Sequence, residues 1–406
     1  MNKELIIAFS LYGIGGAQRR AFNLANEFSK NGYDVYVISV LGRDFTIREE
    51  NYYRCDNDVK LIIAPEYYKN NKNNKTVIQS DRAIDQIVFF LKKLQLLLKH
   101  CKKLLHKLNY NIKSYRQCKE MRSFLLNHPK AKVIVFGFNM FDTVYFASKR
   151  LGCKIIYAET NASNKYKADR YCDITQKTIK KSDALIFQTI EEKAEHGLAE
   201  SKKSFVIHNP IKPNLPQPYS GNRNKTIVNF CRLSRQKNLL LLIQAFQKLI
   251  VDYPEYILKI YADTTDPRND EYKKELLSYI SSNNLEKSVL LLPPSPDIHS
   301  IIIDSAMFVS SSDYEGISNS MIEAMAIGLP CVCTDCDGGG AREMITDGEN
   351  GLLVPIGNVE ALKDAMARMI SENGLAEKCG KNAAKIRDSH SIEKISQKWL
   401  DVINNI

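Results

Sequence analysis

The sequence lacks an apolar stretch long enough to cross a membrane. No segment reaches about 18 uninterrupted apolar residues, whereas a helix that spans a bilayer needs about 20. The opening residues, MNKELIIAFSLYGIGGA, contain a lysine and an apolar stretch, but glycines and a polar AQRR stand where a signal-peptide cleavage site belongs. We therefore expect a first strand and turn here, with no signal peptide and no transmembrane helix.

The sequence also lacks a paired cysteine framework. Its ten cysteines stand mostly singly inside apolar runs, which is typical of a reducing cytoplasm. The densest group, CVCTDC, contains Cys331, Cys333 and Cys336, but no second Cys/His pair stands at a zinc-like spacing. Of the two interpretations, a metal site and buried strand cysteines, we expect the second.

Acidic residues are scarce in one half of the chain. Residues 1–210 hold 36 Lys/Arg against 21 Asp/Glu, whereas the remainder holds 21 against 25, for a formal net charge of +11. Only the first half is therefore expected to face an anionic surface. With 44% hydrophobic residues, the 406-residue chain can bury ordinary globular cores, and its length predicts two domains.

Apolar runs alternate with helix-period segments along the chain. Buried strands are first predicted at ELIIAFSL, YDVYVISV, VKLIIA, AKVIVFGF, CKIIYA, ALIFQT and SFVIHN. After a run with four prolines, IHNPIKPNLPQPYSGNRNK, strands are predicted again at TIVNFCRL, YILKIYA, VLLLP, AMFVSSS, CVCTD and GLLVP. This alternation is typical of doubly wound parallel sheets, which bind ligands outside the carboxyl ends of their strands.

The predicted fold class is α/β, with two Rossmann-like doubly wound domains facing a central cleft. We expect the first domain at 1–210, the linker at 211–224 and the second domain at 225–385. A final helix, within residues 386–406, is a candidate to return to the first domain.

A glycine-rich turn follows the first predicted strand. In YGIGGAQRR, Gly13, Gly15 and Gly16 precede a helix. Glycines let a ligand approach the backbone closely, and a helix N-terminus offers free N–H groups to an anion. A plain tight turn and a dinucleotide site are alternatives. The dinucleotide pattern would need a glycine where Gln18 stands and an acid at the end of the second strand, where only a late Asp44 follows.

Two cations follow the first strand of the second domain. In NFCRLSRQKN, Arg232 stands just after the strand and Lys237 stands at the start of a helix. Two long cations at a strand end suit a diphosphate, because they neutralise the charge that grows on a phosphate leaving group. The alternative is ordinary surface charge.

Two carboxylates flank a predicted helix start in SSDYEGISNSMIEAMAIGLP. Glu315 is expected in a loop at a strand's carboxyl end, and Glu323 within the helix. One interpretation is a capping box over 320–323, in which Glu323 satisfies a backbone N–H. The other is that the carboxylates accept hydrogen bonds from a donor sugar and a ribose, while the amides between them meet phosphate or sugar oxygens.

These residues carry a resemblance to a known family. GIGGAQRRAFNLANEFSKNGYDVYVI, CRLSRQKN and DYEGISNSMIEAMAIGLPCVCTDCDGGGAREMITDGENGLLVPIGN resemble a retaining glycosyltransferase of family four, in the branch that builds bacterial surface polysaccharides. The resemblance implies a GT-B fold and a uridine-diphosphate hexose or N-acetylhexosamine as donor.

The resemblance also implies roles for individual residues: Arg232 and Lys237 would bind the diphosphate, Glu315 the donor sugar and Glu323 the ribose. The catalytic residues would be Glu315, Arg232 and Lys237. The donor-binding set would be Gly15, Gly16, Arg232, Lys237, Glu315, Gly316, Ile317, Ser318, Asn319, Ser320 and Glu323. The acceptor side would hold Gln18, Glu159, Thr160 and Asn161, with Thr160 where relatives often have histidine.

A stretch without acidic residues lies at 86–119, where nine Lys/Arg stand. Its apolar residues follow helical spacing at Leu91, Leu94, Leu98, Cys101, Leu105 and Leu108. The lysines largely between them are Lys92, Lys93, Lys99, Lys102, Lys103 and Lys107. A basic amphipathic helix of this kind is expected to lie in an anionic membrane interface. A core helix with solvated lysines and a nucleic-acid arm are the alternatives.

We therefore expect a cytoplasmic enzyme, peripheral on the inner face of the cytoplasmic membrane. It would move a hexose or N-acetylhexosamine from a nucleotide-diphosphate sugar, expected to be a UDP-sugar, onto a growing lipid-linked polysaccharide or oligosaccharide, with retention. The nucleotide sugar is a co-substrate, and we expect no cofactor, no metal and no nucleic-acid partner. The alternatives are a catalytically silent sugar-nucleotide-binding subunit and a nucleotide-sugar epimerase of the same fold.

Overall fold

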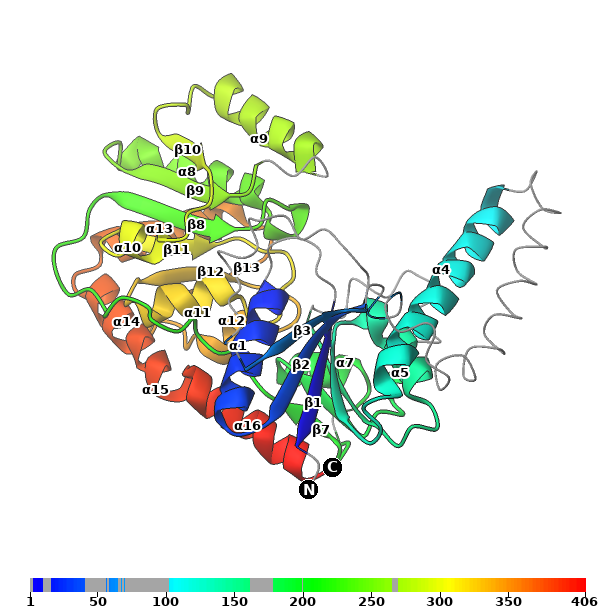
Figure 1. Cartoon of the computed structure of the whole chain (residues 1–406). Helices are drawn as coiled ribbons and strands as arrows, with labels where there is room; N and C mark the ends of the chain where they lie inside the picture. Colours follow the sequence, from blue (N-terminus) through cyan, green and yellow to red (C-terminus); the bar gives the residue numbers. More distant parts are fainter. Residues whose placement is uncertain are drawn as a thin grey trace.

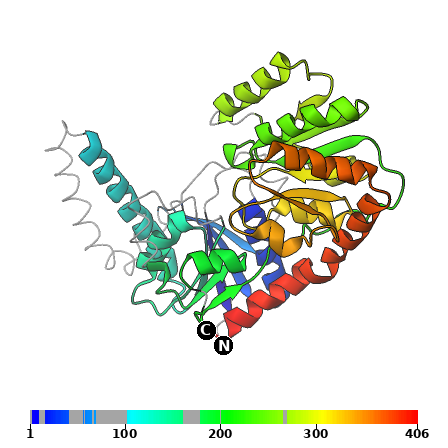
Figure 2. The same ribbon diagram turned by 180° about the vertical axis from the view of Figure 1, so that it is seen from behind.

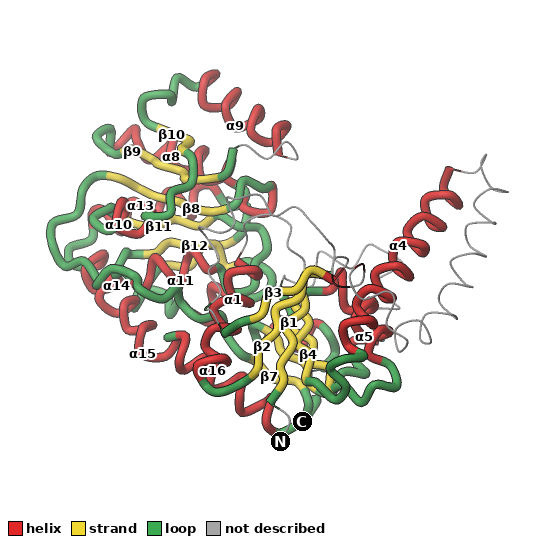
Figure 3. Tube along the Cα trace, in the orientation of Figure 1, coloured by secondary structure: helices red, strands yellow, loops and turns green. Residues whose placement is uncertain are grey.

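The computed structural model describes residues 3–9, 16–40, 56, 58–64, 67, 69, 102–160, 178–198, 200–264 and 269–406. These residues form two α/β domains, each built on its own sheet with helices on both faces (Figure 1, Figure 3). Among the described residues, no helix is both long and apolar enough to cross a bilayer.

The first domain contains a parallel seven-stranded sheet in the order β3-β2-β1-β4-β5-β6-β7. Its strands are β1 (Glu4–Phe9), β2 (Asp34–Ser39), β3 (Lys60–Ile63), β4 (Lys132–Phe136), β5 (Lys154–Ala158), β6 (Ala184–Phe187) and β7 (Ser204–Val206). The apolar residues of the central strands are buried, as expected for a sheet that helices cover on both faces.

The described helices of the first domain include α1 (Gly16–Lys30), α4 (Lys102–Leu125), α5 (Phe141–Ser148) and α7 (Ile190–Glu195). The C-terminal end of α4 is anchored, because Met121, Phe124 and Leu125 are buried in the core of this domain. The rest of α4 extends away from the body of the molecule (Figure 1, Figure 2).

The second domain contains a parallel six-stranded sheet in the order β10-β9-β8-β11-β12-β13. Its strands are β8 (Thr226–Cys231), β9 (Ile257–Ala262), β10 (Val289–Leu292), β11 (Met307–Ser310), β12 (Cys331–Asp335) and β13 (Leu352–Pro355). Its helices are α8 (Leu239–Asp252), α9 (Asp270–Ser282), α10 (Ile298–Ile302), α11 (Asn319–Ala326), α12 (Gly340–Met344), α13 (Val359–Ser371), α14 (Leu375–Ala383) and α15 (Arg387–His390).

The chain crosses between the domains twice, and the two crossings lie side by side. After the proline-rich crossing, Ile211 and Leu215 are buried in a core of the second domain, and the Ile211 N–H donates to the carbonyl of His390 (2.9 Å). The last helix, α16 (Ile392–Asn404), then packs along α1. Its Trp399 is fully buried beside Phe136 in the core of the first domain.

Each sheet reverses its strand order at one point, between β1 and β4 and between β8 and β11. The prediction of two Rossmann-like parallel sheets is confirmed, and the predicted strands are present with slightly shorter bounds. Ligands of such sheets bind where the order reverses, at the carboxyl ends of the strands. The loops after β8 and β11 are therefore the first place to search for a site.

Candidate functional site

Two loops meet at the point where the second sheet reverses. One follows β8 and contains Arg232 and a 3-10 turn, Arg235–Lys237, and the other follows β11 and leads into α11. The Asp313 N–H donates to the Gln236 carbonyl (3.0 Å), and Gln236 Nε2 donates to the Tyr314 carbonyl (2.8 Å). These reciprocal bonds hold the two loops together at the end of the sheet.

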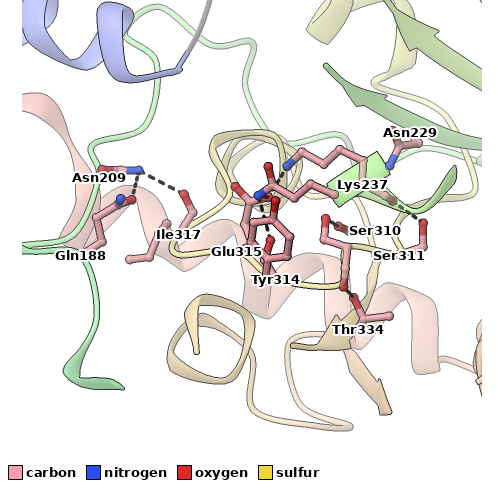
Figure 4. Close-up of polar contacts among 12 residues, drawn as sticks. Gln188, Asn209, Asn229, Lys237, Ser310, Ser311, Tyr314, Glu315, Ile317 and Thr334 are labelled. Atoms are coloured by element: carbon pink, nitrogen blue, oxygen red, sulfur yellow. Dashed lines mark hydrogen bonds and ion pairs between the residues drawn. The ribbon is translucent and has the colours of Figure 1, made fainter. Parts of the chain in front are cut away.

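Lys237 and Glu315 form an ion pair between these loops (Figure 4). Only 10% of the lysine side chain and 20% of the glutamate side chain are exposed. Gln236 Nε2 lies 3.3 Å from the same carboxylate oxygen, and the Ser311 hydroxyl donates to the Lys237 carbonyl (3.0 Å). The structure thus joins two predicted site residues in a partly dehydrated setting, where electrostatic interactions are stronger than in water.

Arg232 completes a cluster of three charges around the end of β8. Burial raises the pKa of the Cys231 thiol to about 11; Lys237 and Arg232 oppose that shift, and Glu315 adds to it. Arg232 itself is exposed and forms no hydrogen bond or ion pair with any described residue. A guanidinium is a strong donor to anionic oxygens, and this one is exposed beside the Lys237–Glu315 pair.

Glu323 lies on α11 and joins the two domains. It is only 2% exposed, and its carboxylate binds the guanidinium of Arg19 on α1 and Nε2 of His299 on α10, the latter at 2.7 Å. Burial alone would raise the pKa of Glu323, but Arg19 and His299 outweigh burial and hold it below the usual value. The carboxylate is therefore ionised and fixed from both sides.

The capping-box interpretation of Glu323 is wrong. The N-cap of α11 is Ser318, not Ser320, and its side chain accepts no capping hydrogen bond. Both carboxylate oxygens of Glu323 are instead directed to Arg19 and His299. These two partners were missed, because the local pattern of α11 carries no signal for residues that reach it from α1 and α10.

The other predicted donor-binding residues surround the start of α11. Ile317 and Ser318 are buried, and Asn319 and Ser320 form the first turn of the helix. Gly16, the first residue of α1, packs so closely that a Cβ there would clash with Asn319 Nδ2. Gly16, at the start of α1, thus contacts the start of α11, while Gly15 lies outside the described residues.

The predicted acceptor-side residues lie on α1 and after β5. Glu159 is buried, and its carboxylate accepts hydrogen bonds from the Tyr157 hydroxyl (2.5 Å) and the Thr160 N–H (2.7 Å). Its side chain therefore holds the backbone N–H of Thr160. Gln18 lies in the first turn of α1, and Asn161 falls outside the described residues.

The basic segment is described only in part. Lys92, Lys93 and Lys99 fall outside the described residues. The backbone of 102–119 belongs to α4, which carries Lys102, Lys103 and Lys107 and continues to Leu125. The predicted helix is thus present over its described portion, and the interface role of the lysines stays a prediction.

Metal ligation has no candidate among the described residues, where no group of three or more His, Cys, Asp or Glu side chains is arranged to hold an ion. Cys331, Cys333 and Cys336 are buried. Burial raises the pKa of each of these thiols, to about 12 for Cys336. Raised pKa values favour the neutral thiol rather than the thiolate that binds metals.

Residues 213–386 match the family model of the glycosyl transferases group 1. The matched region coincides with the second domain, which is therefore similar to the group 1 glycosyl transferases. The match begins in the proline-rich crossing and ends before α16, so it includes the Lys237–Glu315 pair and the whole of α11.

The full chain is similar to known glycosyltransferases. It is 24% identical over 413 residues to an uncharacterized glycosyltransferase of Haemophilus influenzae, covering 99% of this chain and 100% of the relative. A second relative is the N-acetylgalactosamine-N,N'-diacetylbacillosaminyl-diphospho-undecaprenol 4-alpha-N-acetylgalactosaminyltransferase of Campylobacter jejuni. That protein is 32% identical over 219 residues, which cover 52% of this chain and 57% of the relative.

The fold is also similar to that of a solved structure. The crystal structure of HepE from Anabaena in complex with UDP-glucose matches with a TM-score of 0.73 at 16% identity, covering 99% of this chain and 100% of that chain. The predicted GT-B arrangement of two Rossmann-like domains is therefore confirmed.

Proposed function

We propose that this chain is a retaining glycosyltransferase that moves a hexose or N-acetylhexosamine from a UDP-sugar to a lipid-linked glycan. The observation that carries the proposal is the convergence of Arg232, Lys237 and Glu315 at the point where the strand order of the second domain reverses. Support for the substrates comes from HepE, which holds UDP-glucose, and from the Campylobacter relative, whose name specifies an undecaprenol-linked acceptor.

In the proposed complex, the donor diphosphate lies against Arg232 and Lys237. Negative charge on the phosphate grows as the bond to the sugar breaks, so cations that contact the phosphate, above all the largely buried Lys237, stabilise the transition state more than the bound donor. Glu315 compensates the charge of Lys237 before the donor arrives. The same carboxylate would then accept hydrogen bonds from hydroxyls of the donor sugar.

The ribose is proposed to bind at Glu323. The ionised carboxylate would accept two hydroxyl hydrogen bonds once the Arg19 side chain turns aside. Arg19 has room to do so, because 27% of its side chain is exposed, whereas that of Glu323 is only 2% exposed. His299 would remain bound and keep the carboxylate oriented.

Transfer with retention follows if the acceptor attacks from the face that the diphosphate leaves. The bond between the anomeric carbon and the phosphate oxygen breaks, and the acceptor oxygen forms a bond to that carbon on the same face. The acceptor hydroxyl proton passes to the departing phosphate oxygen, which Arg232 and Lys237 stabilise. Charge and atoms balance without a covalent sugar–enzyme intermediate.

A panel of nucleotide sugars tests the proposed donor. UDP-, GDP- and ADP-sugars are compared by thermal shift, and labelled donors are then incubated with undecaprenol-linked glycans. We expect UDP-sugars to stabilise the protein and their sugar to be transferred. Binding without turnover would instead indicate a silent binding subunit, interconversion of the free nucleotide sugar would indicate an epimerase, and no response to any donor would contradict the proposal.

We also propose that the first domain docks on the inner face of the cytoplasmic membrane through the basic segment 86–119. Each basic residue near an anionic surface contributes about 1 kcal/mol, and salt weakens this term. In liposome flotation, the wild type should bind anionic vesicles at low salt. Glutamine at Lys92, Lys93, Lys99, Lys102, Lys103 and Lys107 should release it.

A matched control removes the same number of charges from the second domain. The exposed lysines of that domain include Lys225, Lys248, Lys287, Lys378, Lys381 and Lys385. Glutamine at these positions should leave flotation unchanged. A wild type that does not float, or equal loss in both variants, would contradict docking through this segment.

A further inference from the structure

The loop that carries Glu315 is held from the first domain by a buried amide. Asn209 Nδ2 donates to the carbonyl of Ile317 (3.1 Å) and to Gln188 Oε1 (2.8 Å) (Figure 4). Asn209 is 5% exposed and Gln188 is 4% exposed. A bond to a buried backbone carbonyl fixes the peptide plane to which that carbonyl belongs.

The buried guanidinium of Arg20 fixes the orientation of the Asn209 amide. Arg20 Nη1 donates to Asn209 Oδ1 (2.6 Å), and Nη2 donates to the Glu159 carbonyl (2.8 Å). Because Arg20 is a donor only, the oxygen of the Asn209 amide must face it and the amide nitrogen must face Ile317. Burial of Arg20 over the Phe136 ring leaves the guanidinium little freedom to rotate.

Residues 188–192 of the first domain contact two loops of the second domain. The Gln188 N–H donates to Glu192 Oε2 (2.9 Å), and a Cβ at Gly316 would clash with Glu192 Oε1. The Thr189 hydroxyl donates to the Gly338 carbonyl (2.7 Å). The glycine after Glu315 therefore lies directly against a side chain of the first domain.

We propose that Asn209 is a positioning residue for sugar transfer, acting through the Ile317 carbonyl on the loop that carries Glu315. The inference rests on the proposed function. Holding this carbonyl fixes the direction of the Ser318 N–H, because the two groups of a trans peptide point in opposite directions. Asn209 would thus align Glu315 and the neighbouring amides with the donor sugar, while nucleotide affinity depends on Arg232 and Lys237.

Asn209→Asp tests the contact in the full chain. The substitution keeps an oxygen for Arg20 and removes the N–H groups that donate to Ile317 and Gln188. We expect kcat for transfer to fall about tenfold or more, as for loss of a buried hydrogen bond. The dissociation constant for UDP, measured by calorimetry, should stay within about twofold of the wild-type value.

The matched control is Asn350→Asp. Like Asn209, Asn350 donates its amide to a backbone carbonyl, that of Met344 (3.0 Å), while its side-chain oxygen accepts from the Thr346 N–H (2.7 Å). Its loop is not the one that carries Glu315, so kcat should not change. If Asn209→Asp does not fold, Gln188→Met removes the acceptor next to Asn209 and should lower kcat without changing UDP affinity.

Wild-type kcat in Asn209→Asp, or equal losses of kcat and UDP affinity, would overturn the positioning role. Hydrogen–deuterium exchange over 311–326 gives a second readout that does not depend on activity. It should rise in Asn209→Asp and not in Asn350→Asp, and unchanged exchange would also overturn the proposal. If exchange rises but the wild type transfers no sugar, the positioning contact stands and the proposed function fails.

Discussion

The loop after β11 carries Glu315 and the helix that follows it carries Glu323, and these two carboxylates are held in different ways. Glu315, in the loop, pairs with Lys237 of its own domain. Glu323, on α11, pairs with Arg19 of the first domain and with His299. The charges around Glu315 can therefore assemble within the second domain alone, whereas the environment of Glu323 changes whenever the two domains separate.

The largest expected effect comes from removing the two cations that lie beside Glu315. Replacing both Arg232 and Lys237 with alanine should cost on the order of 2–4 kcal/mol of transition-state stabilisation for each group that meets the departing phosphate. Steady-state transfer rates measure this loss. Wild-type turnover in the double variant would show that the two residues are surface charges.

The helix region should respond through nucleotide affinity. Glu323→Ala should weaken UDP binding by about 1.5–3 kcal/mol, the range for hydrogen bonds to charged groups. Calorimetric titration with UDP measures the change, and circular dichroism checks that the fold is intact. Unchanged affinity would show that Glu323 does not bind the ribose. Its contact with Arg19 would then only link the two domains.

Glu315→Gln sharpens the difference between the two carboxylates. Its proposed partner is the donor sugar, so turnover should fall by more than UDP affinity does. The amide can still accept a hydrogen bond but no longer compensates the charge of Lys237. The activation free energy of turnover should therefore rise by about 1.5–3 kcal/mol. Equal losses in kcat and in UDP affinity would indicate that Glu315 contacts the nucleotide rather than the donor sugar.

The smallest effect concerns a carboxyl group outside both regions. Burial, with Glu159 and Glu195 nearby, raises the pKa of Glu192 well above its usual 4.5, against the opposing Gln188 N–H and Arg20. A raised folded pKa means that the contribution to stability is present below 4.5 and is lost as the pH rises through the folded value.

Glu192→Gln removes this titration. In thermal unfolding across pH, the wild type should lose stability relative to Glu192→Gln as the pH rises above 4.5. Parallel stability curves for the two proteins would contradict a raised pKa at this position.

The sequence was sufficient to predict the sheets and the loops at their ends. Alternating apolar runs predicted the strands, and parallel strands necessarily bring Arg232, Lys237 and Glu315 to one edge. It could not predict the partners from the first domain. Arg19 and Glu323 are 304 positions apart, and no local period specifies such a pair.

Local patterns also misassigned one contact within the second domain. The residues 320–323 match a capping box, yet α11 begins two residues earlier than this motif requires and Glu323 binds His299 instead. In proteins, tertiary packing contributes most of the stability of a helix, so a local capping motif does not by itself decide where the helix begins. Asn209 was missed for a similar reason, because an asparagine at the end of a predicted strand has no sequence signal for the carbonyl of Ile317.

The central claim is that Arg232 and Lys237 bind a nucleoside diphosphate. The most direct measurement is calorimetric titration of UDP and uridine monophosphate into the wild type, Lys237→Ala and the control Lys248→Ala, whose lysine pairs with Glu360 on the surface. We predict that the wild type and the control bind UDP at least about tenfold more tightly than the monophosphate, and that Lys237→Ala loses this preference. Equal affinities of the wild type for the two nucleotides, or an unchanged preference in Lys237→Ala, would contradict the account.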